Sequence, residues 1–484
     1  MNLPLMRICR LVPELVFAAS AAVIVSGCAL QKYHAAPLVP ASSAAAIEAR
    51  SLGNPALHQF FDSAVGPSDA APWPPATWDL RDLTLAAFYY NPALQIARTR
   101  VAEADAAIVT AGEKPNAAIS VDLGGETSPE SPWLAGAGFS LPIETAGKRS
   151  YRISEAQHLA DVARWDLAGT AWTVRAQVRI ALVDYLAARR DLGLLQDEER
   201  VLADEVTLLD QRLAVGMIPR PQVDTARIQQ SQTLLAVRAA EGRLAQTQAA
   251  LAAAIGVPAN ALSNVQITWP QFDDVPSASS LNPAAIQQDA VLNRIDIREA
   301  LAQYAASEAA LRLEIARQYP DIDLGPSWAY EEGSHLFSLG AGAILPIRNR
   351  NQGPIAEAKA RRDEMAAHFL SLQAAGIASS EQALASYDSA LQELAQARQL
   401  LQQSRAREEA AQQALQSGQS DRVALNGTQL QTAVTAVDQF SALYKAQQAL
   451  GALESAVQRP LLPGDIEAPT PQSSFLHSAE RKPR

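Results

Sequence analysis

Two regions of the chain, residues 117–143 and 321–347, alternate apolar residues with small or polar ones. This period of two is that of a β-strand, and a few turn-forming residues divide each region into two runs. The sequence therefore predicts two β-hairpins whose strands each have one apolar face. The Gly-Ala-Gly runs at 136–138 and 340–342 lie within the strands and lack the following helix that a dinucleotide site needs.

Long stretches with a helical period follow the hairpins. Apolar residues three, four and seven positions apart run through about 146–214 and about 353–416. Each stretch predicts a coiled-coil helix of some 65 residues, roughly 100 Å long at a rise of 1.5 Å per residue. Return helices are expected at about 222–255 and 421–457. The predicted fold class is therefore mainly α, with long antiparallel coiled-coil helices and a small β part.

The body of the chain is an internal duplication with a period of about 200 residues. The segment Leu141-Pro142-Ile143 recurs as Leu345-Pro346-Ile347, in the same place relative to its hairpin. The other paired markers, in the same order, are Asn91-Pro92 with Asn293-Arg294, Pro115 with Pro320, and Gly216 with Gly418. We assign the first copy to residues 79–258 and the second to residues 284–457, with a linker at 259–283 between them.

Each copy is expected to open with a single helix of about thirty residues, because a proline closes the helical pattern. These helices are predicted at 79–113, before Pro115, and at 284–318, before Pro320.

Each long helix ends at a glycine and turns into its return helix. In the first turn Gly216 can adopt the left-handed cap, and Pro219 prevents the helix from continuing. In the second turn Gly418 is followed by Ser420, which we expect to be the N-cap of the return helix. We refer to residues 212–224 and 416–423 as the first and second tip.

The N-terminus has the features of a bacterial lipoprotein signal. Arg7 and Arg10 precede an apolar stretch that is too short and interrupted for a stable transmembrane helix, and Ser26-Gly27-Cys28 follows it. Residues 1–27 are predicted to be the signal peptide and Cys28 to be lipidated, because two or more acyl chains anchor a protein stably. An ordinary signal peptide followed by a chance cysteine is the alternative.

Proline-rich segments without periodicity flank the body. Residues 28–78 are predicted to be an extended, lipid-anchored linker, and residues 458–484 a flexible tail.

Composition excludes several classes of protein. The net charge of −11 argues against nucleic acid as a partner, and 48% hydrophobic residues argue against a disordered chain. Two cysteines cannot form a disulfide scaffold. We find no nucleophile elbow, P-loop or paired-carboxylate motif, so no catalytic residue, cofactor or enzymatic activity is predicted. His335, expected in an external loop with Glu331 and Glu332, lacks the spacing of a metal site.

The apolar faces of the strands suit contact with lipid. An open sheet edge cannot lie in hydrocarbon, and single-chain membrane barrels begin at about eight strands. Four strands per chain can therefore close only by sharing, and three chains would supply twelve. Residues expected at the membrane interface are the aromatic Trp133, Trp328 and Tyr330, and the basic Lys148, Arg149, Arg348 and Arg350, which contact lipid head groups or stop the strands from sliding.

The order and duplication of these motifs resemble the outer membrane factor family, the TolC-like exit ducts of tripartite efflux pumps and secretion systems. Segments 141–149 and 345–353 are most similar to the branch that serves heavy-metal cation exporters. The resemblance implies a homotrimer in the outer membrane of a Gram-negative bacterium, with a twelve-stranded β-barrel and a periplasmic α-barrel. It also implies a periplasmic adaptor and an inner-membrane transporter of the RND type. The tip residues implied to dock the adaptor are Gly216, Met217, Pro219, Gly418, Ser420 and Asp421.

One departure from the family pattern concerns the tips. Many members carry an acidic ring a few residues after the second glycine, where this chain has Ala424 and Gly427. Asp224, Asp421 and Arg422 are the candidates for lining a periplasmic aperture. The alternative is that the two acids are ordinary first-turn residues favoured by the helix dipole.

Three functions remain in competition at this point. An efflux duct is the leading hypothesis, and the same duct in a type I protein secretion system is the second. A structural coiled-coil lipoprotein is the third, and the paired hairpins argue against it.

Overall fold

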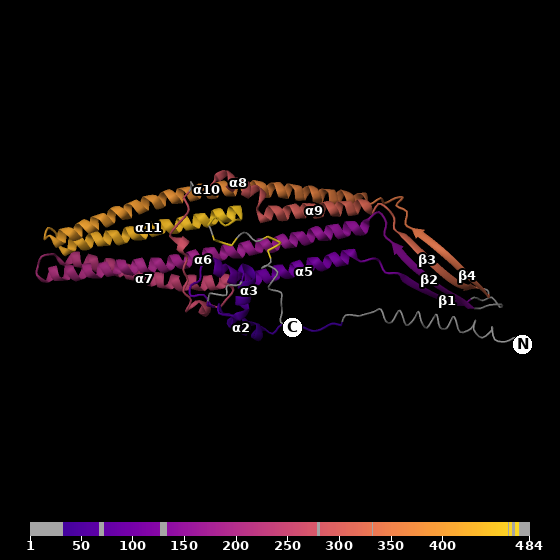
Figure 1. The fold of residues 1–484 in the computed structure, drawn as a ribbon, viewed down its shortest axis with the longest axis horizontal. Coiled ribbons are helices and arrows are strands. Elements are labelled where there is room, and N and C mark those ends of the chain that lie inside the picture. Colours follow the sequence, from indigo (N-terminus) through magenta and orange to yellow (C-terminus); the bar gives the residue numbers. More distant parts are fainter. Residues whose placement is uncertain are drawn as a thin grey trace. The chain divides into compact units, whose positions relative to one another are not determined.

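The computed structural model describes residues 32–66, 72–125, 133–277, 281–331, 333–462, 464–466 and 470–473. The chain divides into two compact units, residues 1–49 and residues 50–484. In the described part of the first unit, helix α2 (Pro40–Glu48) has no buried residue. All the elements below belong to the second unit (Figure 1).

Two pairs of long antiparallel helices form most of this unit (Figure 1). Helix α6 (Lys148–Ala214) is followed by α7 (Arg220–Ile255), and α10 (Gln352–Gln416) is followed by α11 (Arg422–Val457). The members of each pair pack together, and α11 also packs against α6, which joins the two repeats. The 67 residues of α6 span about 100 Å. None of the helices within the described ranges is both long and apolar enough to cross a membrane.

The helix that opens each repeat is broken, so the prediction of a single helix was wrong. The first repeat has α4 (Leu80–Tyr90) and α5 (Pro92–Gly112), and the second has α8 (Pro283–Leu292) and α9 (Ile295–Ala316). Asn91 is extended between α4 and α5, and its side-chain oxygen accepts a hydrogen bond from the backbone nitrogen of Ala93. Pro92 lies at the first turn of α5, where its missing N–H is not needed.

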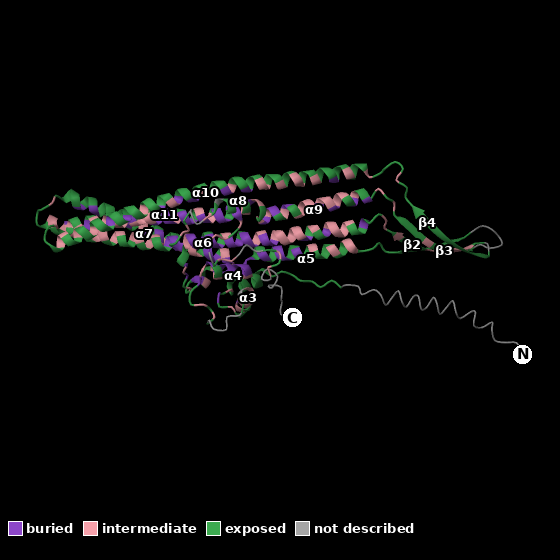
Figure 2. Ribbon diagram, turned by 45° about the horizontal axis from the view of Figure 1, so that its top comes forward, coloured by how far each residue is buried: buried purple, intermediate pink, exposed green. Residues whose placement is uncertain are grey.

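Helices α5, α6, α9 and α10 lie side by side near the sheet (Figure 2). Helix α5 packs against α6, and α9 packs against both α6 and α10. Small residues on α9 allow the close approach, since Ala300, Ala306 and Ala309 are all buried.

The four strands form one antiparallel sheet in the order β1-β2-β3-β4. Their bounds are β1 (Ala118–Gly125), β2 (Trp133–Ile143), β3 (Ile322–Glu331) and β4 (Ser334–Ala343). The two hairpins of the duplicated repeats therefore meet through β2 and β3. The predicted fold class, mainly α with a small four-stranded part, is confirmed.

The register of the sheet separates apolar from polar side chains. Val121 pairs with Ala137, Leu141 with Leu324, and Trp328 with Phe337, all on one face. Residues of the opposite face include Ser120, Asp122, Gly136, Gly138, Asp323, Ser327 and Ser338. The apolar face is uncovered in the single chain, where Leu123 is 82% and Phe337 77% exposed.

The segment 28–78, predicted to be an extended linker, contains regular structure, which corrects that prediction. In the segment 28–78, helix α3 (Pro55–Val65) buries Leu57 and Phe60. In the segment 259–283, short 3-10 helices η1 (Ala259–Leu262) and η2 (Pro270–Phe272) bury Phe272 and other residues. The two segments join in a parallel bridge between Trp78 and Ile267. Prolines 40 and 55 begin helices α2 and α3, a position that proline favours.

The described part of the C-terminal segment packs on the helices, so the prediction of a flexible tail from residue 458 was wrong there. Leu462 is buried in the main hydrophobic core, and Ile466 packs against it. Asp465 pairs with the buried Arg175 of α6 at 2.7 Å. A buried guanidinium requires such partners, because an unpaired charge is strongly unfavourable away from water.

Candidate functional site

The two tips end their long helices with the same backbone arrangement. In the first tip Gly216 has φ +73°, its N–H donates to the carbonyl of Leu213, and that of Met217 donates to the carbonyl of Arg212. In the second tip Gly418 has φ +74°, with the corresponding bonds from Gly418 to Leu415 and from Gln419 to Ala414. This pattern is the Schellman motif, and it confirms the predicted glycine caps.

The side chains of the two tips differ. The first tip exposes apolar groups, with Val215 69% and Met217 75% exposed, and Pro219 is the N-cap residue of α7. The second tip is polar, with Ser417, Gln419 and Ser420 between α10 and α11. Equivalent turns therefore present different surfaces.

Asp421, rather than the expected Ser420, is the N-cap of α11. Its Oδ1 accepts a hydrogen bond of 2.9 Å from the backbone nitrogen of Ala424. Its Oδ2 lies 2.6 Å from Nη2 of Arg212, at the end of α6. The hydrogen bond from Ala424, followed by that from Arg212, holds the pKa of Asp421 below its ordinary value. One carboxylate thus caps a helix and connects the two repeats.

The apolar contacts beneath the tips also cross between the repeats. Leu209, Val223 and Ala226 are buried in one cluster, and Val423 of α11 packs against it. The structure therefore brings Arg212 and Asp421 together over a small shared core.

The other aperture candidates behave differently. Asp224 lies 3.9 Å from Arg220 on its own helix, and Arg422 is exposed at the first position of α11. Ala424 and Gly427 are exposed as well, but Asn426 between them is only 4% exposed. Its Nδ2 donates to the carbonyl of Val201 at 3.0 Å, while its Oδ1 has no partner. Sequence reasoning missed this residue, although a lone amide in an apolar helical stripe signals it.

An ion pair and several hydrogen bonds connect the two hairpins where the sheet meets the helices. Lys148, which we expected near lipid head groups or restraining the strands, is 8% exposed. Its Nζ donates to the carbonyl of Tyr319 and to Asp321, both at 2.7 Å. Asp321 Oδ1 also accepts from the backbone nitrogen of Thr145. The end of the first hairpin is thereby tied to the start of the second.

His335 lies in strand β4, which corrects its expected position in a loop. Its Nδ1 accepts a hydrogen bond of 3.2 Å from Nε1 of Trp328, and Tyr330 packs beside it. Throughout the described ranges, no group of three or more His, Cys, Asp or Glu side chains is placed to hold a metal ion. Cys28, the predicted lipidation site, and the signal peptide 1–27 lie outside the described residues.

Part of the chain matches a protein family, and part of it matches a named relative. Residues 86–257 match the family model described as outer membrane efflux protein. This match agrees with the resemblance seen in the sequence. One relative is the cobalt-zinc-cadmium resistance protein CzcC of Cupriavidus metallidurans, 29% identical over 240 residues. These residues are 48% of this chain and 56% of CzcC, so the match spans about half of each protein.

Solved structures share the fold at low sequence identity. The outer membrane protein VceC of Vibrio cholerae superposes with a TM-score of 0.63 at 17% identity, covering 78% of this chain and 95% of VceC. The CmeC outer membrane channel of Campylobacter jejuni gives a TM-score of 0.65 at 14% identity, covering 83% and 89%. The open-state MtrE outer membrane channel of Neisseria gonorrhoeae gives 0.60 at 17% identity, covering 78% and 88%. The fold is therefore that of the TolC-like outer membrane channels.

Proposed function

We propose that the chain is one subunit of an outer-membrane efflux channel, a passive exit duct that conducts substrates across the periplasm and the outer membrane. The observation that carries this proposal is the sheet. Its apolar face is uncovered, and within the described residues β1 and β4 each pair on one side only. Such a sheet can enter lipid only if its edges are closed. The family match of residues 86–257 supports the same function.

The closed form that we propose is a homotrimer. Three copies of a four-stranded sheet make a twelve-stranded barrel, above the minimum of about eight strands for membrane barrels. The apolar face would contact outer-membrane lipids. Lipid attached to Cys28 would hold each chain at the same membrane, in a Gram-negative bacterium.

The tips are the proposed docking site for a periplasmic adaptor, which in turn would engage an inner-membrane transporter of the RND type. Figure 1 shows the sheet and the tips at opposite ends of the helices of the second unit. Met217 and Pro219 would give the adaptor an apolar contact, whereas Ser420 and Asp421 would give it polar ones. Gly216 and Gly418 shape these turns. Asp224, Asp421 and Arg422 would line the aperture between the tips.

Heavy-metal cations are the proposed substrates. The name of the relative CzcC describes resistance to cobalt, zinc and cadmium. The hairpin sequences also favour cations, because residues 115–147 and 321–347 contain eight Asp and Glu residues and no Lys or Arg. Of these acids, Asp122 and Asp323 lie on the polar face of the sheet, which would face the channel. Their negative potential attracts cations.

The first experiment is the protein mass of the particle extracted by detergent from outer membranes, measured by light scattering coupled to chromatography. Three chains per particle is the expected result. A monomer, or release of the Cys28→Ser variant without detergent, would favour the structural lipoprotein instead. Growth of a deletion strain in zinc, cobalt and cadmium then tests the substrate. Normal metal resistance with impaired export of a protein would indicate a secretion duct.

A further inference from the structure

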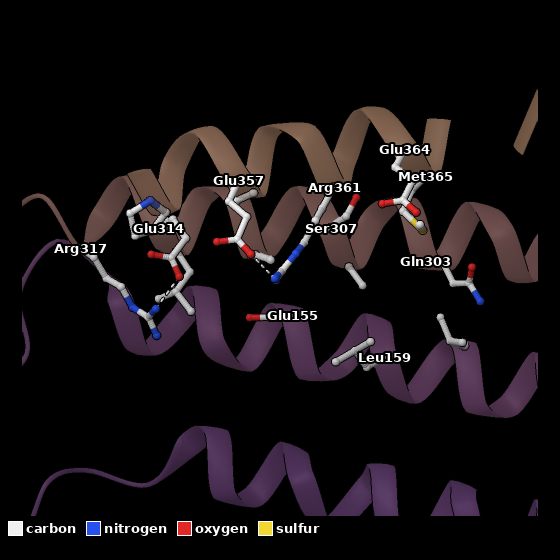
Figure 3. Close-up of a pocket in the computed structure, with 16 residues that line it drawn as sticks. Glu155, Leu159, Gln303, Ser307, Glu314, Arg317, Glu357, Arg361, Glu364 and Met365 are labelled. Atoms are coloured by element: carbon white, nitrogen blue, oxygen red, sulfur yellow. Dashed lines mark hydrogen bonds and ion pairs between the residues drawn. The ribbon is translucent and has the colours of Figure 1, made fainter. Parts of the chain in front are cut away.

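Helices α6, α9 and α10 line a groove of about 730 Å³ (Figure 3). Its apolar surface is formed by Leu159, Val162, Ala306, Ala310, Leu313 and Met365. The volume lies within the range of about 300–1,000 Å³ that is usual for small-molecule sites.

The charged side chains of the groove leave an excess of negative charge. Arg317 is paired with Glu314, and Arg361 is paired with Glu357. Both cationic side chains of the lining are thus matched by carboxylates. Glu155 and Glu364 also line the groove, and in the described structure neither makes a hydrogen bond or ion pair. The lining therefore holds four carboxylates and only two guanidinium groups beside an apolar surface.

Glu155 is the more enclosed of the two. Figure 3 shows it on α6 beside Leu159, below the Glu357–Arg361 pair of α10. Burial raises the pKa of the Glu155 carboxyl; the nearby Arg317 opposes the shift and Glu314 adds to it. A carboxylate deprived of water in this way gains from a cation brought beside it.

We propose that this groove binds amphipathic organic cations, with the apolar part of the ligand against Leu159, Val162 and Leu313 and its positive group between Glu155 and Glu364. Charge complementarity selects the cation, and the apolar surface selects against small hydrated ions. This binding site goes beyond the proposed efflux function, since binding is a property of the folded chain and requires neither an adaptor nor transport.

The test uses the full chain purified in detergent and rhodamine 6G as a fluorescent amphipathic cation. We expect saturable binding in fluorescence polarisation, and no saturable binding of the anionic fluorescein, which has the same ring system. The double variant Glu155→Gln with Glu364→Gln should weaken rhodamine binding about tenfold. It removes the attraction of two carboxylates for the positive group of the ligand, and partial exposure to water limits the strength of each attraction. Leu159→Ala should weaken binding about threefold through lost apolar contact.

The matched control is Glu308→Gln, which removes one negative charge from α9 outside the groove, where Glu308 pairs with Arg312. This variant should bind as the native chain does. Equal affinities for the native chain and the double variant would overturn the proposal, as would the absence of saturable binding. A change in particle mass in the double variant would identify the groove as a contact between copies and would overturn it as well.

Discussion

Arg175 and Arg179 are charged side chains in the middle of α6 that are almost wholly removed from water, with exposed fractions of 1% and 2%. Arg175 lies 3.2 Å from Glu454 of α11 and 2.7 Å from Asp465, and it stacks on Trp172. These contacts join the first repeat, the second repeat and the C-terminal segment. One side chain therefore holds together three parts of the chain that are far apart in sequence.

Replacing Arg175 with alanine is expected to lower the free energy of unfolding by about 3–5 kcal/mol, because the buried Asp465 would lose its ion-pair partner and Glu454 would keep only Arg179 as a cationic neighbour. The measurement is the midpoint of thermal unfolding of the detergent-solubilised protein. Arg190→Ala is the control, since Arg190 also pairs with a carboxylate, Asp273, but at the surface, where such pairs contribute about 0–1 kcal/mol. Equal losses in both variants would contradict the role of the buried cluster.

Asp82 gives the fold a pH dependence. Burial, and then the carboxylate of Asp79, raise the pKa of Asp82 from 3.8 to about 6. The folded state thus binds this proton more tightly than the unfolded state does. The contribution of Asp82 to stability is fully present below pH 4 and is lost as the pH rises from about 4 to about 6.

Asp82→Asn should therefore be more stable than the native chain at pH 7.5, by about 1 kcal/mol after allowance for the partial exposure of the group. At pH 4 the two proteins should unfold at nearly the same temperature. Thermal unfolding across this range checks the prediction, with the exposed Asp197→Asn as a control. A constant difference at all pH values would mean that the variant acts through packing instead.

At the scale of elements, the breaks in the helices are positioned by backbone contacts. Gly256 ends α7 with φ +90°, and a Cβ placed there would lie 2.9 Å from the carbonyl oxygen of Tyr90. Asn91, at the break between α4 and α5, donates from Nδ2 to the carbonyl of Ala254. The end of α7 and the break between α4 and α5 thus fit together only because residue 256 has no side chain.

Gly256→Ala is expected to cost about 2–4 kcal/mol of stability, which combines the strain of a left-handed alanine with the collision at Tyr90. Gly418→Ala is the matched comparison, because Gly418 has φ +74° but open space around its Cβ position. It should cost only about 1 kcal/mol. Thermal unfolding of the two variants measures the difference, and equal effects would show that the contact with Tyr90 relaxes freely.

Sequence patterns predicted the elements whose signal is local. The period of two located the hairpins, and the spacing of apolar residues located α6 and α10, in which Leu202 and Leu394 are buried. Two prolines that begin helices were misread. Pro55 begins α3 in a segment predicted to be extended, and Pro92 begins α5 inside the single helix predicted at 79–113. The packed C-terminal segment and the Arg212–Asp421 pair were missed because their partners are remote. In that pair the two residues are 209 positions apart, and no local pattern connects them.

At the scale of the whole molecule, the sheet is the feature that a single chain leaves incomplete. Its apolar residues are exposed, and its two outer strands have further backbone groups available for pairing. Long exposed edges of this kind promote association with other strands. The proposed trimer resolves both features at once, because closing the barrel pairs the edges and turns the apolar face towards lipid.

Leu339 and Ser338 provide a direct test of which face meets the membrane. They are neighbours on β4 and point to opposite faces; Leu339 is 77% exposed, whereas Ser338 lies 2.7 Å from Ser327 across the strands. Leu339→Arg would place a charge in hydrocarbon, at a cost of about 2–4 kcal/mol per chain near the bilayer midplane. It should therefore reduce the amount of trimer recovered from outer membranes, measured by quantitative blotting and particle mass. Ser338→Arg would face the water of the channel and should assemble normally. If the two variants were recovered equally, the apolar face would not be the lipid-facing surface, and the barrel that we propose would lose its main physical support.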